Sequence, residues 1–131
     1  MSQKEVNYWV VGASWGGIDH QDERFVNEKF WMLGWEKDDQ PSLYAAASQI
    51  AIGDRIAIKR MKGKGQTGIR ILHIGIVMGV ILDNSRIVCT VDWCATNLDR
   101  DVEDSKGCFK AIHGPYQMSS HGDWLRQIFS L

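Results

Sequence analysis

The longest continuous strand pattern in the sequence runs from Ile69 to Leu82, and it restricts the fold more than any other segment. Most of its residues are β-branched or otherwise apolar, which is typical of a strand. Asp83-Asn84-Ser85 is a turn sequence, and Arg86 to Trp93 follows as an antiparallel partner. Gly75 and Gly79 lie inside the long strand, where glycine often marks a bend or bulge. A long, bent hairpin predicts a small, mostly antiparallel barrel.

Three other segments are predicted to be helices that flank this barrel. Asp22 to Phe30 carries acidic residues in its first turn, where the helix dipole favours them. Pro41 to Gln49 begins with a proline that suits the first turn, and Ser42 can cap it. Near the C-terminus, Ser119 and Ser120 are expected to cap a third helix. This helix has an apolar stripe at helical spacing, formed by Trp124, Leu125, Ile128 and Phe129.

The remaining segments complete an α+β pattern. Val6 to Gly12 is nearly all apolar, which predicts a strand buried on both faces. Phe30 to Trp35 is expected to be a strand or an extended loop, and Arg55 to Met61 alternates as a half-buried strand does. Thr96 to Lys106 is predicted to be a loop, and Cys108 to Ile112 a short last strand. The order of elements predicts an α+β fold, a small mostly antiparallel PUA-like β-barrel with about three helices.

Composition excludes several classes of protein. The net charge of -1 and the pI of about 6.4 give no overall signature of nucleic-acid binding. Three cysteines without CxxC spacing do not form a disulfide framework and suggest a reduced, cytoplasmic compartment. No signal peptide opens the chain, and the run from Ile69 to Leu82 is too short and polar to span a bilayer. We expect a single soluble domain over residues 1–131, without a membrane partner.

A search for catalytic chemistry finds little. The Lys62 to Gly68 loop lacks the residue order of a nucleotide-binding P-loop, and Ser14 is not in a G-x-S-x-G elbow. Cys94 could act as a nucleophile, but a small buried thiol explains it equally simply. The one combination that could hold a metal ion, His113 and His121 near Cys108, lacks the usual ligand spacing. We therefore expect no enzymatic activity, no metal ion and no cofactor.

Tryptophan is unusually frequent, with six residues in 131. Four of them lie in or at the end of apolar segments that adjoin glycine, serine or aspartate, namely Trp15, Trp31, Trp35 and Trp93. Converging aromatic rings could enclose a flipped nucleobase, since stacking contributes about 1–3 kcal/mol per base. Ser14, Asp19, Asn27 and Asp92 are candidates to read the edges of that base. The alternative is a core rich in tryptophan, with Trp15 in an ordinary turn.

Positive charge is concentrated in one segment, since Asp54 to His73 contains six Lys or Arg residues and one Asp. One interpretation is a solvated hairpin tip, and the other is an edge that contacts phosphates. The candidate phosphate-contacting residues are Arg55, Lys59, Arg60, Lys62, Lys64 and Arg70.

Five sequence blocks carry a family resemblance, and they occur in order over most of residues 6–93. They are WVVGASWGGID at 9–19, Arg24-Phe25, Phe30-Trp31 through Gly34-Trp35, IAIGDRIAIK at 50–59, and Ile74-Gly75-Ile76-Val77 with Val91-Asp92-Trp93. The chain resembles EVE domains of the PUA-like superfamily, which are relatives of the YTH readers of methylated RNA. The nearest likeness is to N-terminal modules of McrB-like restriction ATPases. The resemblance implies a barrel with a pocket for a modified base, lined by Ser14, Trp15, Trp31 or Trp35, and Trp93.

The leading hypothesis is a non-catalytic module that recognises a modified base in DNA or RNA. The chain has no ATPase or nuclease segment, so it would act with a separate nuclease or ATPase, or as one domain of a longer protein. Two alternatives remain. One is an ASCH-like small enzyme or small-molecule binder that uses Lys59, Asp92 or Asp19. The other is a protein-interaction domain with an exposed tryptophan patch.

Overall fold

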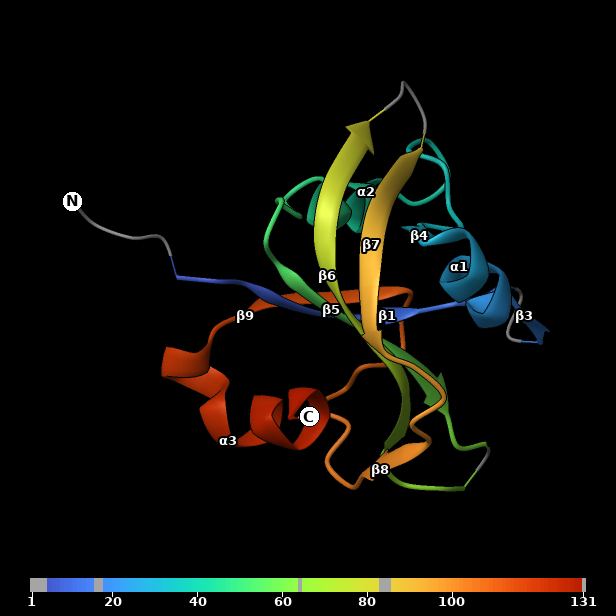
Figure 1. The fold of residues 1–131 in the computed structure, drawn as a ribbon. Coiled ribbons are helices and arrows are strands. Elements are labelled where there is room, and N and C mark those ends of the chain that lie inside the picture. Colours follow the sequence, from blue (N-terminus) through green and yellow to red (C-terminus); the bar gives the residue numbers. More distant parts are fainter. Residues whose placement is uncertain (1–4, 16–17, 64, 83–85, 131) are drawn as a thin grey trace.

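The computed structural model describes residues 5–15, 18–63, 65–82 and 86–130, and Figure 1 shows its fold. The strands of the described residues are β1 (Tyr8–Gly12), β2 (Ser14–Trp15), β3 (Asp19–His20), β4 (Phe30–Met32), β5 (Arg55–Met61), β6 (Ile69–Leu82), β7 (Ile87–Ala95), β8 (Arg100–Val102) and β9 (Ile112–Tyr116). The helices of the same residues are α1 (Asp22–Glu28), α2 (Pro41–Ala47) and α3 (Met118–Phe129). The predicted α+β class with three helices is confirmed for the described part of the chain.

The main sheet is mostly antiparallel. Its strand order is β4-β7-β6-β5-β1-β9, and β8 pairs with β6 outside this path. Strands β1 and β5 run parallel, with Gly12 opposite Lys59 at their carboxyl ends. The end strands β4 and β9 do not pair with each other among the described residues, so the sheet is open along this path. Strands β2 and β3 form a separate small ladder directly after β1.

The long strand β6 organises the sheet, because it pairs with β5 and β8 along its first part and with β7 along its second. Its pairing with β7 shifts register between Ile74 and Gly75, and again between Val77 and Gly79. The predicted bulges at the two glycines are therefore confirmed. Figure 1 shows the resulting β6–β7 hairpin as a long curved pair.

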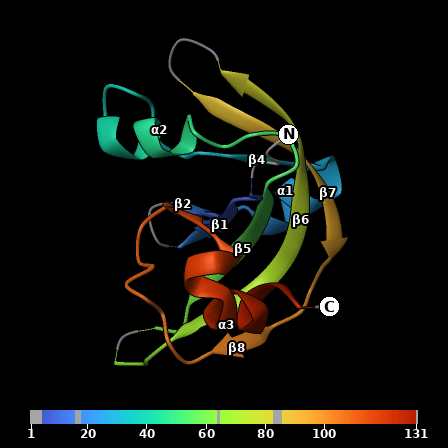
Figure 2. The same ribbon diagram turned by 90° about the vertical axis from the view of Figure 1, so that its left-hand side faces the viewer.

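Two apolar cores lie on opposite faces of the sheet. Trp9 and Val11 of β1 belong to the first core, while Val10 belongs to the second. Helix α3 covers the second core with a stripe that includes Trp124 and Leu125, and Figure 2 shows α3 in front of β5. All three β1 side chains are fully buried. The prediction that this strand is buried on both faces is confirmed.

The prediction of a half-buried strand at Arg55 to Met61 is wrong. Ile56 and Ile58 enter the first core, as their shared face suggested, but Ala57 is also fully buried, in the second core. Lys59 is only 6% exposed. The alternation of residue types is real, but α3 covers the face that was expected to meet solvent.

Two strands differ from the expected ones in the last third of the chain. The segment predicted to be a loop contains β8, whose Val102 is buried and pairs with Ile69. Three residues with one apolar side chain give no recognisable strand pattern. The last strand begins at Ile112, where the expected strand ends, and contains Pro115. Proline is tolerated there because β9 is at the edge of the sheet and needs fewer ladder N–H groups.

The expected serine caps are also wrong. The N-cap residues of α2 and α3 are Gln40 and Gln117, and neither makes a side-chain capping hydrogen bond. The hydroxyl of Ser119 instead donates to Glu5 Oε2 at 3.0 Å. Helix α1 ends two residues earlier than predicted, because Lys29 adopts a left-handed conformation with φ of 60°. None of the helices in the described ranges has the length and apolar character needed to cross a membrane.

The bulge at Gly75 yields a stability prediction. A Cβ atom at Gly75 would lie 2.4 Å from Val91 Cγ1 and 2.8 Å from the Asp92 carbonyl oxygen. We expect Gly75→Ala to destabilise the protein by about 1–3 kcal/mol, as overpacking usually does. Urea unfolding measures this change.

Gly79→Ala is the matched control on the same strand. Its Cβ would approach closely only Thr90 Oγ1, at 2.7 Å, and this hydroxyl can rotate away. Equal destabilisation by the two substitutions would show that close packing at Gly75 is not what requires glycine there.

Candidate functional site: a pocket lined by tryptophan and lysine

Four of the six tryptophans are fixed by their indole N–H groups. These bonds run from Trp9 Nε1 to Asp54 Oδ2 at 2.9 Å, Trp31 Nε1 to Gly12 O at 3.0 Å, Trp93 Nε1 to Phe25 O at 3.1 Å, and Trp124 Nε1 to Asp104 O at 2.7 Å. Each bond joins segments at least 19 residues apart in the sequence. A buried N–H without an acceptor would be costly, so these rings serve the fold.

Two of these four were expected to line the base pocket. Trp31 is fully buried in the first core and has no exposed surface for a ligand. Trp93, on β7, is half-buried against α1 and lies edge-on to the His73 ring, with the ring centroids 6.3 Å apart. Neither lines the cavity described below. The structure thus assigns Trp31 and Trp93 to packing positions.

The other two tryptophans, Trp15 and Trp35, have no indole hydrogen bond to any described residue and line one common pocket. Trp15 lies on β2, and its ring packs so closely on Gly34 that a Cβ there would be 2.6 Å from Nε1. Trp35 follows β4 and is 43% exposed. Gly34 is therefore a position where a side chain would displace the Trp15 ring.

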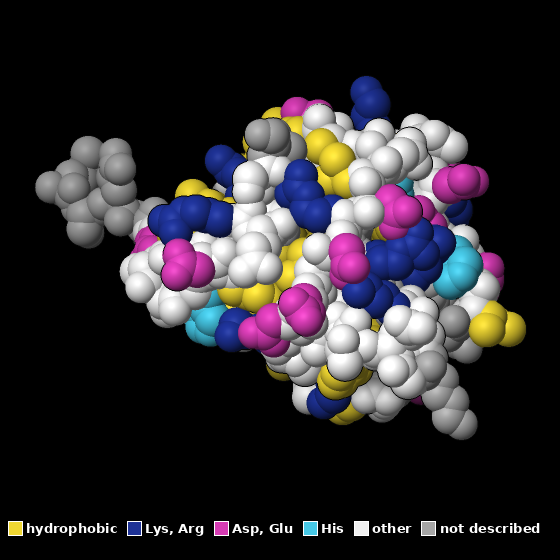
Figure 3. Space-filling view, turned by 90° about the horizontal axis from the view of Figure 1, so that it is seen from below, with side chains coloured by type: hydrophobic (Ala, Val, Ile, Leu, Met, Phe, Trp, Pro, Cys, Tyr) yellow, Lys and Arg dark blue, Asp and Glu magenta, His cyan; other side chains and the backbone are white. Residues whose placement is uncertain are grey.

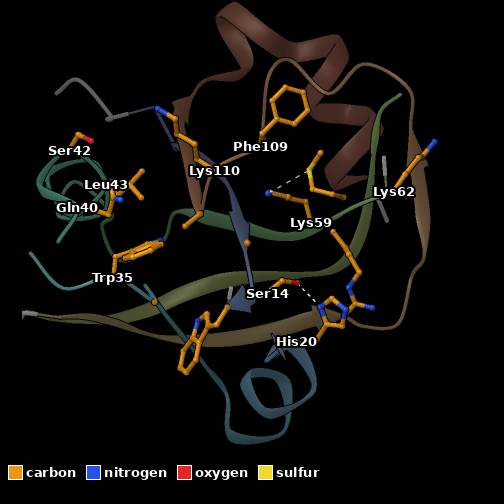
Figure 4. Close-up of a pocket in the computed structure, with 17 residues that line it drawn as sticks. Ser14, His20, Trp35, Gln40, Ser42, Leu43, Lys59, Lys62, Phe109 and Lys110 are labelled. Atoms are coloured by element: carbon orange, nitrogen blue, oxygen red, sulfur yellow. Dashed lines mark hydrogen bonds between the residues drawn. The ribbon is translucent and has the colours of Figure 1, made fainter. Parts of the chain in front are cut away.

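The pocket has a volume of about 780 Å³, which lies within the usual range of about 300–1,000 Å³ for ligand sites. Besides the two tryptophans, its lining includes the apolar residues Leu43, Met61 and Phe109 and the polar residues Ser14, His20, Gln40 and Ser42. Ser14 Oγ and His20 Nδ1 are hydrogen-bonded at 2.6 Å, which fixes both side chains across the β2–β3 ladder. In Figure 4, Trp35 and Leu43 lie across the cavity from Lys62, with Phe109 and Ser14 on the remaining sides.

Positive charge also lines this pocket. The cationic residues are Lys59, Arg60, Lys62 and Lys110, and none of the described lining residues is an Asp or Glu. The pocket lies at the carboxyl ends of the parallel strands β1 and β5. The segment before β9 crosses this end, with the N–H of Gly12 donating to the Ala111 carbonyl at 2.8 Å. An anionic ligand with a flat ring is the chemistry that such a lining favours.

A buried carboxylate holds Arg60 at the pocket. Arg60 Nη2 lies 2.6 Å from Asp22 Oδ1, and His73 Nε2 lies 2.8 Å from Asp22 Oδ2. The N–H of Asn97 donates to His73 Nδ1, so the proton of a neutral His73 is on Nε2, which donates to Asp22. Burial raises the pKa of Asp22, but the His73 hydrogen bond and the Arg60 charge outweigh it and lower this pKa overall. The network joins α1 to β5 and β6.

The other predicted phosphate contacts are dispersed. Lys62 lines the pocket but also pairs with Asp101, and Arg70, outside it, pairs with Asp99. Figure 3, which views the molecule from below the orientation of Figure 1, shows Lys and Arg side chains next to Asp and Glu side chains. Arg55 lies at a different, smaller cavity of about 200 Å³. Lys64 is outside the described residues.

The polar residues predicted to read the edges of a base are also only partly at the pocket. Ser14 lines the pocket, whereas the exposed residues Asp19, Asn27 and Asp92 do not. Asp19 Oδ1 accepts a hydrogen bond from Gln21 Nε2 at 2.9 Å, near the start of α1. The acidic side chains expected to read a base are therefore absent from the described lining.

Sequence reasoning missed several lining residues, chiefly Phe109 and Lys110. Phe109 is 64% exposed, and its neighbour Lys110 is exposed and has no ion pair with a described residue. An aromatic residue next to a basic one was a usable signal, but the segment was expected to be a strand. No sequence pattern around His20 or Gln40 indicates that these residues line a pocket.

Lys59 is the most unusual residue of the lining. Its side chain is buried, and the contact recorded for its Nζ is Met61 Sδ at 3.9 Å. Burial lowers the pKa of this amine, and the smaller effect of Cys108 acts in the opposite direction. Figure 4 shows the amine between Phe109 and Ser14.

Comparison of the sequence with known proteins does not assign a family. No protein-family model matches the chain, and no curated protein matches it. The function is therefore inferred from the chemistry of the pocket residues.

His113, behind the pocket, yields a pH prediction. Its Nε2 accepts the Lys110 N–H at 2.9 Å, and burial, together with the charges of Lys59 and Lys110, lowers its pKa from 6.5 to about 4. Between these two values the unfolded chain binds more protons than the folded one, so acidification lowers the free energy of unfolding. We expect His113→Gln to reduce this loss, as measured by urea unfolding across that pH interval.

His121→Gln, on α3, is the control histidine. Asp22 does not affect the pH dependence in this interval. Its pKa is lowered from 3.8, so its stabilisation of the fold is lost only as pH falls below that value. An unchanged pH dependence in His113→Gln would contradict the role of His113.

Proposed function

We propose that the chain is a non-catalytic module that binds a modified base of DNA or RNA in the pocket between Trp15 and Trp35. The observation that carries the proposal is the distribution of the tryptophans. The two whose N–H groups have no acceptor among the described residues are the two that line a pocket with four cations and no described carboxylate. Aromatic faces bind bases by stacking, and cations bind the phosphates beside them.

Base extrusion accounts for the mixed lining of the pocket. A flipped base leaves its stack and needs new ring contacts, which Trp15 and Trp35 offer at about 1–3 kcal/mol per stacked base. The side chains of Ser14, Gln40 and Ser42 can hydrogen-bond to its edges. Lys110 and Lys62 lie where the attached phosphates would leave the pocket. The cavity volume leaves room for a whole nucleotide.

The same proposal includes the finer description of the fold and the family. A curved, mostly antiparallel sheet with three described helices is compatible with a PUA-like barrel of the EVE type. The turn after β1, with Ser14 and Trp15, and Trp35 after α1 both lie at the pocket, as the resemblance implies. A separate nuclease or ATPase would then act on the strand that this module recognises.

An ASCH-like enzyme is the second candidate, and the buried amine of Lys59 is the observation in its favour. An acid–base mechanism would also need a partner group, but Asp19 and Asp92 are not part of the described lining. Release of acetate from an N-acetylated nucleoside would support this enzyme, and its absence would favour binding. A protein-interaction patch of tryptophans is less well supported, because four of the six rings are bonded within the fold.

Trp35→Ala tests the stacking surface. Because Trp35 is 43% exposed, its removal should leave the fold intact. We expect binding of the preferred oligonucleotide to weaken by about 1–3 kcal/mol. Fluorescence anisotropy would measure it with oligonucleotides that contain one 5-methylcytosine, 5-hydroxymethylcytosine or N6-methyladenine, and with unmodified ones, as DNA and as RNA.

Met78→Ala is the matched control, since Met78 is 57% exposed on β6 and outside the pocket. The proposal fails if the wild-type protein binds none of these oligonucleotides. It also fails if Trp35→Ala binds as tightly as the wild-type protein.

Lys110→Gln tests the phosphate contact. Each phosphate that a cation neutralises releases counterions and contributes about 0.7 to the salt slope for a single strand. We expect Lys110→Gln to reduce the slope of log K against log salt by about this amount, for modified and unmodified strands alike. Lys29→Gln removes the same charge from an exposed lysine outside the pocket and should leave the slope unchanged. Equal slopes for all three proteins would remove Lys110 from the interface.

A further inference from the structure

The Lys59 side chain is placed where an ordinary phosphate-binding lysine would not be. Surface lysines reach phosphates with mobile, hydrated amines. Lys59 is instead 6% exposed, and its amine packs on the backbone of Gly12, where a Cβ atom would lie 3.7 Å from Nζ. Among the described residues, Nζ has no oxygen acceptor; its recorded contact is Met61 Sδ at 3.9 Å. The amine nevertheless belongs to the lining of the pocket.

An ammonium group has three donors and no acceptor, so only acceptor atoms can satisfy it. Burial of an unpaired charge is unfavourable, and an anion next to it removes most of that cost. No described residue of the lining supplies a carboxylate. The missing acceptor can therefore come from the ligand.

The groups around Lys59 strengthen this argument, because most of them are cationic or neutral. The titratable and charged groups around it are Arg60 on its own strand and Lys62 just after that strand, Cys108, Lys110 and His113 before and in β9, and His20 across the pocket. Arg60 and Lys62 are themselves paired with Asp22 and Asp101, which lie outside the described lining. The same positive charge acts on His113, since burial and then the charges of Lys59 and Lys110 lower its pKa. Such a field favours an anion inside the cavity as well as at its rim.

We propose that Lys59 binds an oxyanion that the bound nucleotide carries into the interior of the pocket, beside the Trp15 and Trp35 rings. This proposal rests on the proposed function for the nucleotide, and it adds that an anionic group of the ligand enters the interior of the site. The oxyanion has two possible sources, a carboxylate on the modified base or the phosphate of the same nucleotide.

Three small probes separate these sources: cytidine, 5-carboxycytidine and cytidine monophosphate. Calorimetric titration of the whole chain should show that one or both anionic probes bind at least about tenfold more tightly than cytidine, as a charge-assisted hydrogen bond predicts. Preference for 5-carboxycytidine assigns the oxyanion to the base, and preference for the monophosphate assigns it to the phosphate. Lys59→Met should abolish the preference in either case.

Lys29→Met is the matched control, since it removes an exposed lysine that lies outside the pocket. It should keep most of the preference for the anionic probe. The proposal is overturned if neither anionic probe binds more tightly than cytidine. Equal weakening of all three probes by Lys59→Met also overturns it.

Thermal unfolding of Lys59→Met separates ligand binding from a structural role. Methionine has a similar length and no charge, so it removes an uncompensated buried charge from the free protein. We expect the unfolding midpoint to stay the same or rise while oxyanion binding is lost. A lower midpoint together with unchanged probe preference would show that Lys59 is structural.

The pH dependence of binding gives a further signature. Burial lowers the pKa of Lys59, so it loses its proton at a lower pH than an exposed lysine would. Affinity for the anionic probe should therefore fall as pH rises through that value, and this fall should be absent in Lys59→Met. A pH dependence that persists in Lys59→Met contradicts the proposal.

The two proposals fail in different ways. If oligonucleotides bind through Trp35 but Lys59→Met binds all of them normally, the modified-base proposal stands and the oxyanion proposal falls. If no oligonucleotide binds but cytidine monophosphate does so through Lys59, the nucleic-acid proposal falls and the oxyanion site stands.

Discussion

A buried indole N–H must find an acceptor, and this requirement accounts for much of the arrangement of the protein. Trp9, Trp31, Trp93 and Trp124 each donate to a distant carbonyl or carboxylate, and each bond connects elements that the sequence separates. These connections fix β4 against β1, α1 against β7, and the loop before β5 against β1. The pocket is formed where the two remaining rings, Trp15 and Trp35, lie between those fixed elements. One hydrogen-bonding rule thus separates the four tryptophans that join parts of the framework from the two that line the pocket.

The pocket combines two features that work against the stability of the free protein. Lys59 places a charge in a largely apolar position, and Lys110 at the same cavity has no ion pair with a described residue. Protein stability is small, so an unpaired buried charge is a substantial fraction of it. Such arrangements are typical of sites where binding matters more than maximal stability. By contrast, the charge of Arg60 is compensated by Asp22 through a short ion pair, and His73 is hydrogen-bonded to the same carboxylate.

The local parts of the fold could be predicted from the sequence, and the parts set by tertiary contact could not. The glycines at 75 and 79 predicted the bulges of β6, because a bulge is a local property of the chain. The burial of Lys59 was missed, since it depends on residues that follow it by about fifty positions. Ser14, Trp15 and Trp35, which the sequence grouped by their positions at the ends of apolar segments, line one pocket in the structure. Trp31 shares that pattern, but its N–H lies within reach of the Gly12 carbonyl, which sequence spacing does not reveal.

The parallel pairing of β1 and β5 has a consequence for how the site can diversify. The carboxyl ends of both strands lie at the same edge of the sheet, and residues that line the pocket lie at or just beyond the last ladder bonds there. The turn after β1, the loop before α2, the end of β5 and the segment before β9 each supply one wall. Exchange of any one wall would alter the shape and charge presented to a ligand while the strand register stayed the same. The lining of the pocket can therefore change without a change in the sheet, as in other sheet proteins whose sites lie at the carboxyl ends of parallel strands.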